Sequence, residues 1–201
     1  MHIGLIDYRA GNLTSVRKGF AAAGAELLLP ATPADLEECA GLVVPGVGHF
    51  AATTALDESW REAIIRRVDA GVPLLGICLG MQWLLEGSAE APGLTGLHLI
   101  AGRCERMVVE RPLKIPHVGW NTLRIRKNSS LLDGIEDGTQ VYFTHSFAAP
   151  LSTDCVAAAE HGQPFAAVVQ REHVAGVQFH PEKSGEAGLR MLRNFVTMAK
   201  G

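Results

Sequence analysis

The sequence predicts an α/β fold with a mostly parallel central sheet that extends into antiparallel strands. Within about the first 85 residues, short apolar runs without alternation are separated by amphipathic helical patterns. Such runs are typical of βαβ units and a parallel sheet. From about residue 97 to 178 the pattern changes to strand after strand. No linker, repeat or low-complexity segment divides the chain, so we expect a single domain over residues 1–201.

Local signals mark each element of the first half. Residues 3–7 form an apolar run, and residues 13–23 have a helical pattern in which Asn12 suits the N-cap and Gly24 the C-terminal stop. The run at residues 73–77 lacks alternation, as expected for a strand buried on both faces. Further strands are expected at residues 25–29 and 41–44, and further helices at residues 59–70 and 79–86.

In the second half, alternating and β-rich runs predict strands at residues 121–126, 141–147 and 156–160. Residues 165–170 and 174–179 are expected to pair across a turn at residues 171–173. A final amphipathic helix is expected at residues 187–199, because its apolar side chains share one stripe.

Composition excludes several classes of function. The formal net charge is −3 and no block of basic residues occurs, which argues against nucleic acid or anionic membrane lipid as a partner. No apolar stretch approaches the roughly 20 residues that span a bilayer, and the N-terminal residues do not resemble a signal peptide, so we expect a cytoplasmic protein. The four cysteines lack metal-ligand spacing, which predicts three core thiols, one candidate nucleophile and no metal.

The candidate nucleophile is Cys78, in the pentapeptide Gly-Ile-Cys-Leu-Gly at residues 76–80. The pentapeptide joins a predicted strand to a predicted helix, so free backbone amides and the positive end of the helix dipole would point at the sulfur. Gly76 and Gly80 suit a sharp elbow in which neighbouring backbone comes close. The alternative is a small buried hydrophobic residue between two packing glycines.

The candidate base and its orienting acid are His180 and Glu182, separated by Pro181. Side chains two positions apart in an extended chain point to the same side, so the carboxylate is expected to reach one ring nitrogen and leave the other free for the thiol. The alternative is a surface His–Glu pair. By sequence alone, three other histidines compete as bases: His49, His117 and His145.

The loop Pro-Gly-Val-Gly at residues 45–48 follows a predicted parallel strand, at the end where open α/β sheets place their sites. Two glycines around Val47 allow that peptide either orientation. It could therefore present an N–H to a developing oxyanion, with the amide of Leu79 as second donor. A plain tight turn is the alternative, and a phosphate loop is disfavoured because no Gly-Lys-Ser/Thr follows.

Six motifs occur in order: Asp-Tyr-Arg-Ala-Gly-Asn-Leu at 7–13, Pro-Gly-Val-Gly-His-Phe at 45–50, Gly-Ile-Cys-Leu-Gly-Met-Gln at 76–82, Lys-Ile-Pro-His-Val-Gly-Trp-Asn at 114–121, Tyr-Phe-Thr-His-Ser-Phe at 142–147 and His-Pro-Glu-Lys-Ser at 180–184. Together they resemble the triad-type (class I) glutamine amidotransferases, and in detail the glutaminase subunits of imidazole glycerol phosphate synthase. The resemblance implies a three-layer, flavodoxin-like class I glutamine amidotransferase fold. Residues 116–121 are the most specific of these motifs, because general amidotransferase chemistry does not require them.

The resemblance implies that Cys78 attacks glutamine and that His180, oriented by Glu182, moves the proton to the departing ammonia. It implies no cofactor. A glutamyl thioester would form and water would release glutamate. Oxyanion and substrate contacts are implied for eight further residues: Gly46, Val47, Gly48, Leu79, Gln82, His145, Ser146 and Phe147.

The implied partner is a (β/α)₈-barrel cyclase subunit that forms a heterodimer with the chain and receives its ammonia. There, imidazole glycerol phosphate and an aminoimidazole carboxamide nucleotide would form in histidine biosynthesis. The implied interface positions are Asn12, Trp120, Tyr142 and Lys183. We also expect the peptide around Val47 to act as a switch, with a carbonyl pointing inward until the partner favours the N–H-inward form.

Two positions depart from the family pattern. Arg9 stands where the family mostly has glycine, and Phe147 replaces a common tyrosine. Two alternatives remain open: a glutaminase of another pathway, such as pyridoxal phosphate or purine synthesis, and a catalytically silent scaffold subunit. The first leaves residues 7–13 and 114–121 unexplained, and the second leaves the joint presence of thiol, imidazole and carboxylate unexplained.

Overall fold

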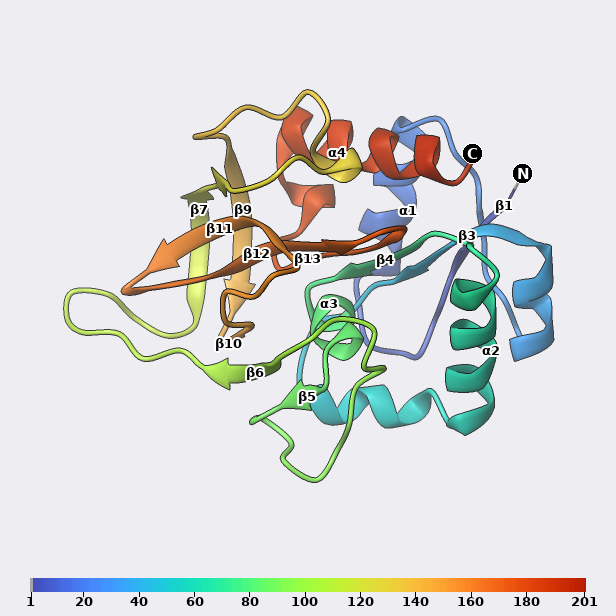
Figure 1. Cartoon of the computed structure of the whole chain (residues 1–201), viewed down its shortest axis with the longest axis horizontal. Coiled ribbons are helices and arrows are strands. Elements are labelled where there is room, and N and C mark those ends of the chain that lie inside the picture. Colours follow the sequence, from blue (N-terminus) through green and yellow to red (C-terminus); the bar gives the residue numbers. More distant parts are fainter. Residues whose placement is uncertain (1) are drawn as a thin grey trace.

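An eight-stranded sheet forms the centre of the computed structural model, which describes residues 2–201. Pairing is parallel across its first five strands and antiparallel across the rest (Figure 1), which confirms the predicted mostly parallel sheet with an antiparallel extension. In spatial order the strands are β2 (Leu27–Leu28), β1 (His2–Leu5), β3 (Cys39–Val44), β4 (Leu74–Ile77), β13 (Val174–Val177), β12 (Gln163–Arg171), β11 (Cys155–His161) and β8 (Arg124–Ile125).

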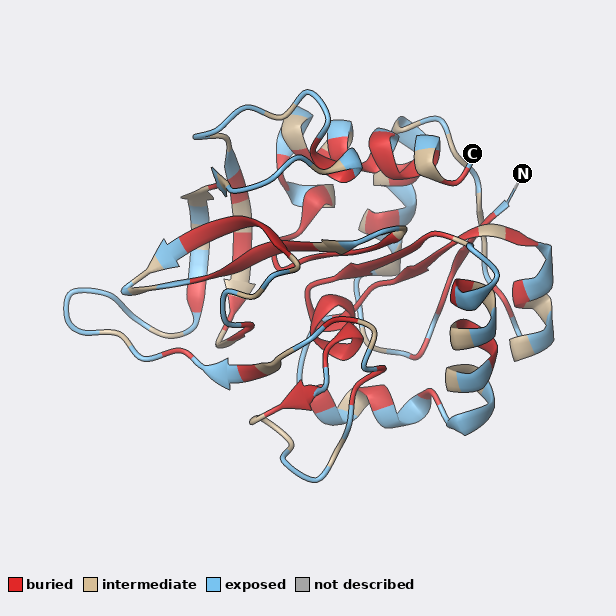
Figure 2. Ribbon diagram, in the orientation of Figure 1, coloured by how far each residue is buried: buried red, intermediate tan, exposed pale blue. Residues whose placement is uncertain are grey.

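Helices cover both faces of this sheet, which gives three layers. On one face α1 (Leu13–Ala22) and α4 (Gly185–Met198) share an apolar cluster, where the rings of Phe20 and Phe195 meet edge to face at 6.2 Å between centroids. On the other face α2 (Glu58–Asp69) and α3 (Leu79–Leu84) share a second cluster. Figure 2 shows that α3 and the sheet strands around it are buried.

Helix ends follow the expected local chemistry. The Asn12 side chain accepts a hydrogen bond from the Ser15 amide at 3.2 Å, and Gly24 lies just past the C-cap with φ +83°, which confirms both predicted ends of α1. No helix among residues 2–201 is long and apolar enough to cross a membrane. Four short 3₁₀ helices lay outside the prediction: Pro33–Glu38, Phe50–Ala55, Ser130–Leu132 and Pro181–Lys183.

Two predicted strands are wrong as single elements, because each is divided between two sheets. The stretch 121–126 breaks at the buried Leu123, which exchanges backbone hydrogen bonds with Thr139 and Gly138, so that β7 (His117–Thr122) leaves the central sheet and pairs with β9 (Gln140–His145). The stretch 141–147 breaks at residue 146. Its end joins a three-stranded sheet of β10 (Phe147–Ala148), β6 (Arg103–Arg106) and β5 (Gly87–Ser88).

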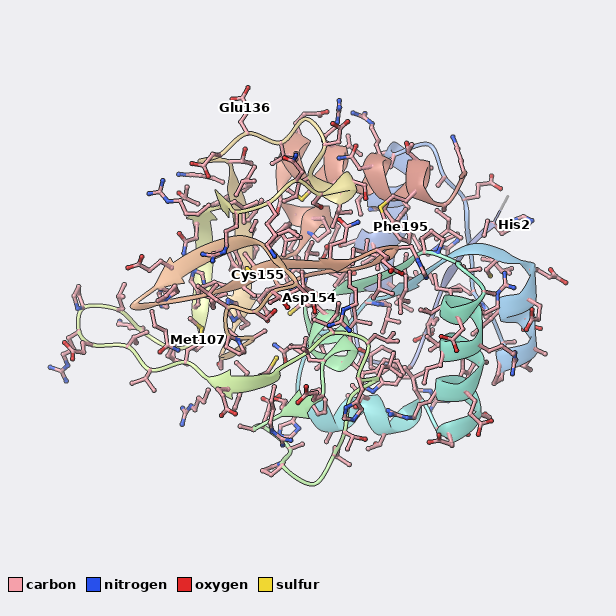
Figure 3. All side chains as sticks on the ribbon, in the orientation of Figure 1. His2, Met107, Glu136, Asp154, Cys155 and Phe195 are labelled. Atoms are coloured by element: carbon pink, nitrogen blue, oxygen red, sulfur yellow. The ribbon has the colours of Figure 1, made fainter. Side chains whose placement is uncertain are left out.

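Three cysteines are core thiols, as predicted. Cys39, Cys104 and Cys155 are free and buried, and burial raises the pKa of each thiol. Figure 3 shows Cys155 among the strands of the central sheet. Such thiols are protonated at neutral pH, which leaves Cys78 as the candidate nucleophile.

Candidate active site

Cys78 lies on a sharp turn between β4 and α3. Its φ of +53° is in the left-handed region, which is strained for a residue with a side chain and is found disproportionately at functional sites. The flanking glycines permit close packing: a Cβ on Gly80 would lie 1.8 Å from the Val44 carbonyl oxygen, and one on Gly76 would lie 2.6 Å from the Met81 amide. The structure confirms the predicted strand-to-helix elbow.

Parallel pairing of β13 with β4 brings His180 to this elbow. Val177 is in register with Ile77, and the Cys78 amide donates a 2.7 Å hydrogen bond to the Val177 carbonyl. The carboxyl ends of the two strands therefore lie side by side, where α/β sheets place their sites. His180 follows three residues after β13 ends. Residues far apart along the chain meet because two neighbouring strands end together.

His180 and Glu182 form a buried pair. Nδ1 of the ring lies 2.8 Å from the Oε1 atom of Glu182, and each side chain is 2% exposed. The expected extended geometry is wrong, because Pro181–Lys183 is a 3₁₀ turn that folds the carboxylate back onto the ring. The backbone of His180 is held by Ser184, whose hydroxyl donates to its carbonyl at 2.7 Å, and by its own amide, which donates to the Tyr142 carbonyl at 2.9 Å.

The surroundings of His180 favour its charged form. Burial lowers the pKa of the imidazole, but the Cys78 sulfur and the Glu182 carboxylate outweigh it and raise the pKa to about 9. The Nε2 atom of His180 is buried and has no partner of hydrogen-bond geometry among residues 2–201. The sulfur is thus close enough to act on the ring electrostatically, and one ring nitrogen remains free to exchange a proton.

The competing histidines are engaged elsewhere. Nδ1 of His145 donates to the Phe147 carbonyl at 2.9 Å, and its Nε2 lies 3.0 Å from Nδ1 of His117. Burial lowers the pKa of His145 to about 3 and that of His117 to about 4, so both are neutral. Nδ1 of His49 accepts the Ala51 amide at 3.1 Å. Of the four candidate bases, His180 alone presents a free nitrogen toward the sulfur.

A cavity of about 310 Å³ opens above the thiol. It brings together seven of the predicted oxyanion and substrate residues with Cys78, whereas the eighth, Gly46, does not line it. The lining residues are Val47, Gly48, Cys78, Leu79, Gln82, Glu90, Pro116, Thr144, His145, Ser146 and Phe147.

On the oxyanion side of the cavity, one expected hydrogen-bond donor is not free. The Leu79 amide, one of the two expected donors, is occupied by the Gly46 carbonyl at 3.4 Å. Val47 is 38% exposed, and a Cβ on Gly48 would meet no atom within 4 Å, so this loop has room to move. In this structure the Gly46 carbonyl, and not an N–H, faces the Leu79 amide.

Two polar residues of the site escaped the sequence prediction. Glu90 lines the cavity, and its Oε2 atom accepts the Phe50 amide at 2.7 Å. Gln178 is fully buried, its Nε2 lies 3.6 Å from the Cys78 sulfur, and its Oε1 accepts from Gln82 at 3.1 Å. Glu90 carried no sequence signal. Gln178 stands two residues before His180, and the apolar run around it concealed a role at the thiol.

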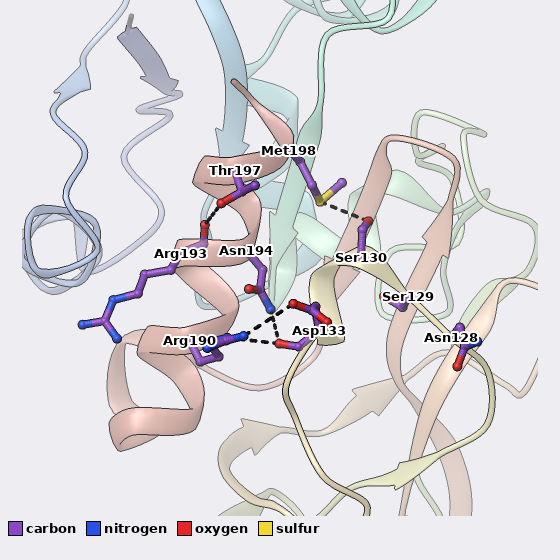
Figure 4. Close-up of a pocket in the computed structure, with 9 residues that line it drawn as sticks. All are labelled: Asn128, Ser129, Ser130, Asp133, Arg190, Arg193, Asn194, Thr197 and Met198. Atoms are coloured by element: carbon purple, nitrogen blue, oxygen red, sulfur yellow. Dashed lines mark hydrogen bonds and ion pairs between the residues drawn. The ribbon is translucent and has the colours of Figure 1, made fainter. Parts of the chain in front are cut away.

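A larger cavity of about 840 Å³ lies elsewhere, between α4 and the 3₁₀ helix Ser130–Leu132 (Figure 4). Several of its polar groups already have partners: Asn194 donates to the carbonyls of Leu131 and Asp133 at 2.9 and 2.8 Å, and Arg190 pairs with Asp133 at 3.4 Å. Its lining contains no thiol and no histidine, so it does not compete with the cavity at Cys78.

Three of the four predicted interface residues gather near β7 and β9. The ring centroids of Trp120 and Tyr142 lie 6.1 Å apart, and the Lys183 ammonium lies 5.8 Å from the centre of the Tyr142 ring. Trp120 and Val118 are 55% and 58% exposed, which makes this an apolar surface. The fourth residue, Asn12, caps α1.

Comparison with known proteins places this geometry in a family. The family model of class-I glutamine amidotransferases matches residues 5–199. A protein from Methanothermobacter thermautotrophicus named imidazole glycerol phosphate synthase subunit HisH is 45% identical over 199 residues, covering 98% of this chain and 99% of its own length. The subunit of the same name from Geobacillus kaustophilus is 45% identical over 207 residues, covering 99% of this chain and 98% of its own length.

Solved structures show the same fold at lower identity. A crystal structure of a protein described as a glutamine amidotransferase superposes with a TM-score of 0.77 at 20% identity and covers 99% of both chains. A putative GMP synthase protein from Thermoplasma acidophilum superposes with a TM-score of 0.72 at 19% identity, covering 100% of this chain and 94% of its own. These likenesses establish the three-layer architecture.

Proposed function

Because the chain belongs to the class I glutamine amidotransferases, we propose that Cys78, His180 and Glu182 carry out its hydrolysis of glutamine. Relatives that are 45% identical over nearly the whole chain make it a glutaminase subunit of imidazole glycerol phosphate synthase, acting in histidine biosynthesis. One observation carries this assignment of residues. The buried His180 ring has its Nδ1 atom 2.8 Å from Glu182 Oε1, and its Nε2 atom is left without a partner beside the Cys78 thiol.

The reaction follows from this geometry. The Cys78 thiolate adds to the side-chain carboxamide carbon of glutamine, and the carbonyl oxygen becomes an oxyanion. As the oxyanion collapses, the C–N bond breaks and His180 gives its Nε2 proton to the departing nitrogen, which leaves as ammonia. The acyl group stays on the sulfur as a thioester. A water deprotonated by His180 then attacks this carbon, releasing glutamate and restoring the thiolate.

The amino-acid end of the substrate is assigned to the far side of the cavity. Glu90 supplies a carboxylate that suits the α-ammonium group, since the other side chains lining the cavity away from the thiol are neutral at pH 7. Gln82 and the backbone of residues 145–147 would position the α-carboxylate. Phe147 lacks the hydroxyl of the common tyrosine, so backbone groups carry more of this binding here.

The oxyanion would be held by two backbone amides, those of Val47 and Leu79. The structure supports a resting state in which the Gly46 carbonyl occupies the Leu79 amide at 3.4 Å. Rotation of the Gly46–Val47 peptide would withdraw this carbonyl and bring the Val47 N–H inward. We propose that partner binding favours the rotated form.

The partner would be a (β/α)₈-barrel cyclase subunit, bound in a heterodimer through the exposed surface formed by Val118, Trp120, Tyr142 and Lys183, with Asn12 also in contact. Ammonia is largely protonated in water at neutral pH and is then no nucleophile. A sealed path from the thiol to the cyclase would keep it neutral until imidazole glycerol phosphate and an aminoimidazole carboxamide nucleotide form.

The test is covalent labelling with a glutamine-like electrophile in the presence of the cyclase and its nucleotide ligand. We expect mass spectrometry to place one label on Cys78, with none on a Cys78→Ala variant and normal labelling of a Cys104→Ala control. Glutaminase activity should rise when the nucleotide is added. Absence of label would favour the silent scaffold, and failure to bind the cyclase would favour a glutaminase of another pathway.

A further inference from the structure

Tyr8, which none of the assigned roles uses, carries an unpaired hydroxyl in the interior. It follows β1, its side chain is 5% exposed, and its Oη atom has no hydrogen-bond partner among the described residues 2–201. An unpaired buried hydroxyl is unfavourable and rare, because it has given up its hydrogen bonds to water. Burial, followed by the charge of Cys78, raises the pKa of this phenol, so it stays protonated and can donate.

The hydroxyl lies against the oxyanion loop. A Cβ built on Gly46 would lie 2.1 Å from the Tyr8 Oη atom, so the hydroxyl occupies the space that any side chain at residue 46 would need. The carbonyl of this same Gly46 occupies the Leu79 amide in the resting state. A peptide rotation that frees Leu79 must leave the Gly46 carbonyl in need of a new donor, and the unpaired Tyr8 hydroxyl lies directly against Gly46.

We propose that Tyr8 is a positioning residue for the oxyanion site: its hydroxyl donates to the Gly46 carbonyl once the Gly46–Val47 peptide has rotated away from Leu79. This inference rests on the proposed function, because it takes that rotation as given. The resting state then contains an unpaired donor and the rotated state a paired one. The hydroxyl therefore favours the active form without touching the substrate, and it does not line the cavity.

The size of the effect depends on how populated the rotated form is. The net contribution of one neutral hydrogen bond corresponds to about a three- to tenfold change in an equilibrium. Where the rotated form is rare, the rate is proportional to its population and the whole factor appears in kcat. Where partner and nucleotide already hold most molecules in the rotated form, the loss is smaller. KM for glutamine stays unchanged in both cases.

The experiment compares Tyr8→Phe with the wild type in the complex with the cyclase, measuring glutamate formation with and without the nucleotide ligand. We expect kcat without nucleotide to fall about three- to tenfold and to fall less with nucleotide, at constant KM. The thermal midpoint of the isolated variant should equal or exceed that of the wild type, because an unpaired buried hydroxyl has been removed.

The matched control is Thr53→Val, which removes a buried hydroxyl that does have a partner, the Phe50 carbonyl at 2.9 Å. This control should lower the thermal midpoint and leave kcat unchanged, the reverse of Tyr8→Phe. A Tyr8→Phe complex with wild-type kcat without nucleotide would overturn the proposal, as would a lowered midpoint that accounts for the lost rate. Labelling of Cys78 in the wild type tests the proposed function independently of this comparison.

Discussion

The two sides of the Cys78 thiol are prepared to different degrees. On the proton-transfer side, the His180–Glu182 pair is 2.8 Å apart, both side chains are 2% exposed, and Ser184 and β9 hold the histidine backbone. On the oxyanion side, the Leu79 amide is occupied by a carbonyl. The Tyr8 hydroxyl on that side is unpaired, with no partner among residues 2–201.

Under the proposed function, this difference indicates where regulation would act. A preorganised base exchanges protons at once, whereas an oxyanion site that must first rotate a peptide stays slow until something favours the rotated form. The chain thus keeps its thiol and base ready and withholds the electrostatic stabilisation that usually contributes most to such a reaction. Under the proposed function, hydrolysis of glutamine in the absence of an acceptor would be limited in this way.

The largest expected effect comes from breaking the prepared side with Glu182→Gln. Glutamine keeps the shape but removes the charge that, together with the sulfur, raises the pKa of His180. We expect kcat to fall by at least about a hundredfold, as in other triads whose orienting carboxylate is neutralised. Steady-state glutaminase assays of the complex measure this.

The control for that variant is Glu186→Gln, which removes an exposed carboxylate paired with Arg193 at 2.9 Å on the same stretch of chain. It should leave kcat unchanged. Glu182→Gln activity within a few-fold of the wild type would contradict the view that the proton-transfer side depends on this pair.

The same two sides differ in how far the sequence predicted them. Cys78 and the parallel strands around it carry local signals, namely apolar runs, helix caps and the two glycines of the elbow. His180 and Glu182 were predicted as a pair because they are near neighbours in sequence. Their approach to the thiol depends on β13 pairing with β4, which the sequence did not predict, because residues 174–179 were expected to pair only with residues 165–170.

The parts that sequence missed depend on contacts between distant segments. The alternation of residues 121–126 continues through Leu123, although the chain changes sheets there, so a period of two residues could not reveal the break. Glu90 reaches the cavity from a turn after β5, a strand of two residues with no pattern of its own. The Tyr8 hydroxyl is unpaired because the distant segments packed around it offer no partner among residues 2–201, and a sequence pattern cannot reveal this.

A pH titration sharpens the contrast between His180 and the neutral histidines. The pKa of His180 is raised from 6.5 to about 9, so the folded chain binds this proton more tightly than the unfolded chain does. Its contribution to the free energy of unfolding is complete below pH 6.5 and is lost as the pH rises through 9. We expect kcat/KM of the complex to decline near pH 9, where the proton donor is lost.

The two neutral histidines, His145 and His117, change the stability with pH in the opposite direction. The pKa values of His145 and His117 are lowered to about 3 and 4, so the unfolded chain takes up these protons first and stability is lost as the pH falls below 6.5. NMR titration of the imidazole resonances measures all three groups. A His180 that titrates near 6.5 in the wild type would contradict the proposed pairing, and Glu182→Gln should move its pKa downward.

The smallest expected effect is a change in stability from a substitution at Arg9, in the loop that carries Tyr8 on the oxyanion side. Arg9 has φ +61°, in the left-handed region that glycine adopts without strain, and its amide is held by the Asp7 carboxylate at 2.8 Å. Arg9→Gly should therefore raise the free energy of unfolding by up to about 1 kcal/mol, or a few degrees in Tm, measured by urea denaturation and calorimetry. Glu172→Gly is the matched control, because Glu172 has φ +52° in the β12–β13 turn and should gain a similar amount. A gain in stability at Glu172 without one at Arg9 would mean that the oxyanion-side loop relieves its backbone strain through other contacts. The unpaired groups of that loop would then be held less tightly than the His180–Glu182 pair, both by packing and by hydrogen bonds.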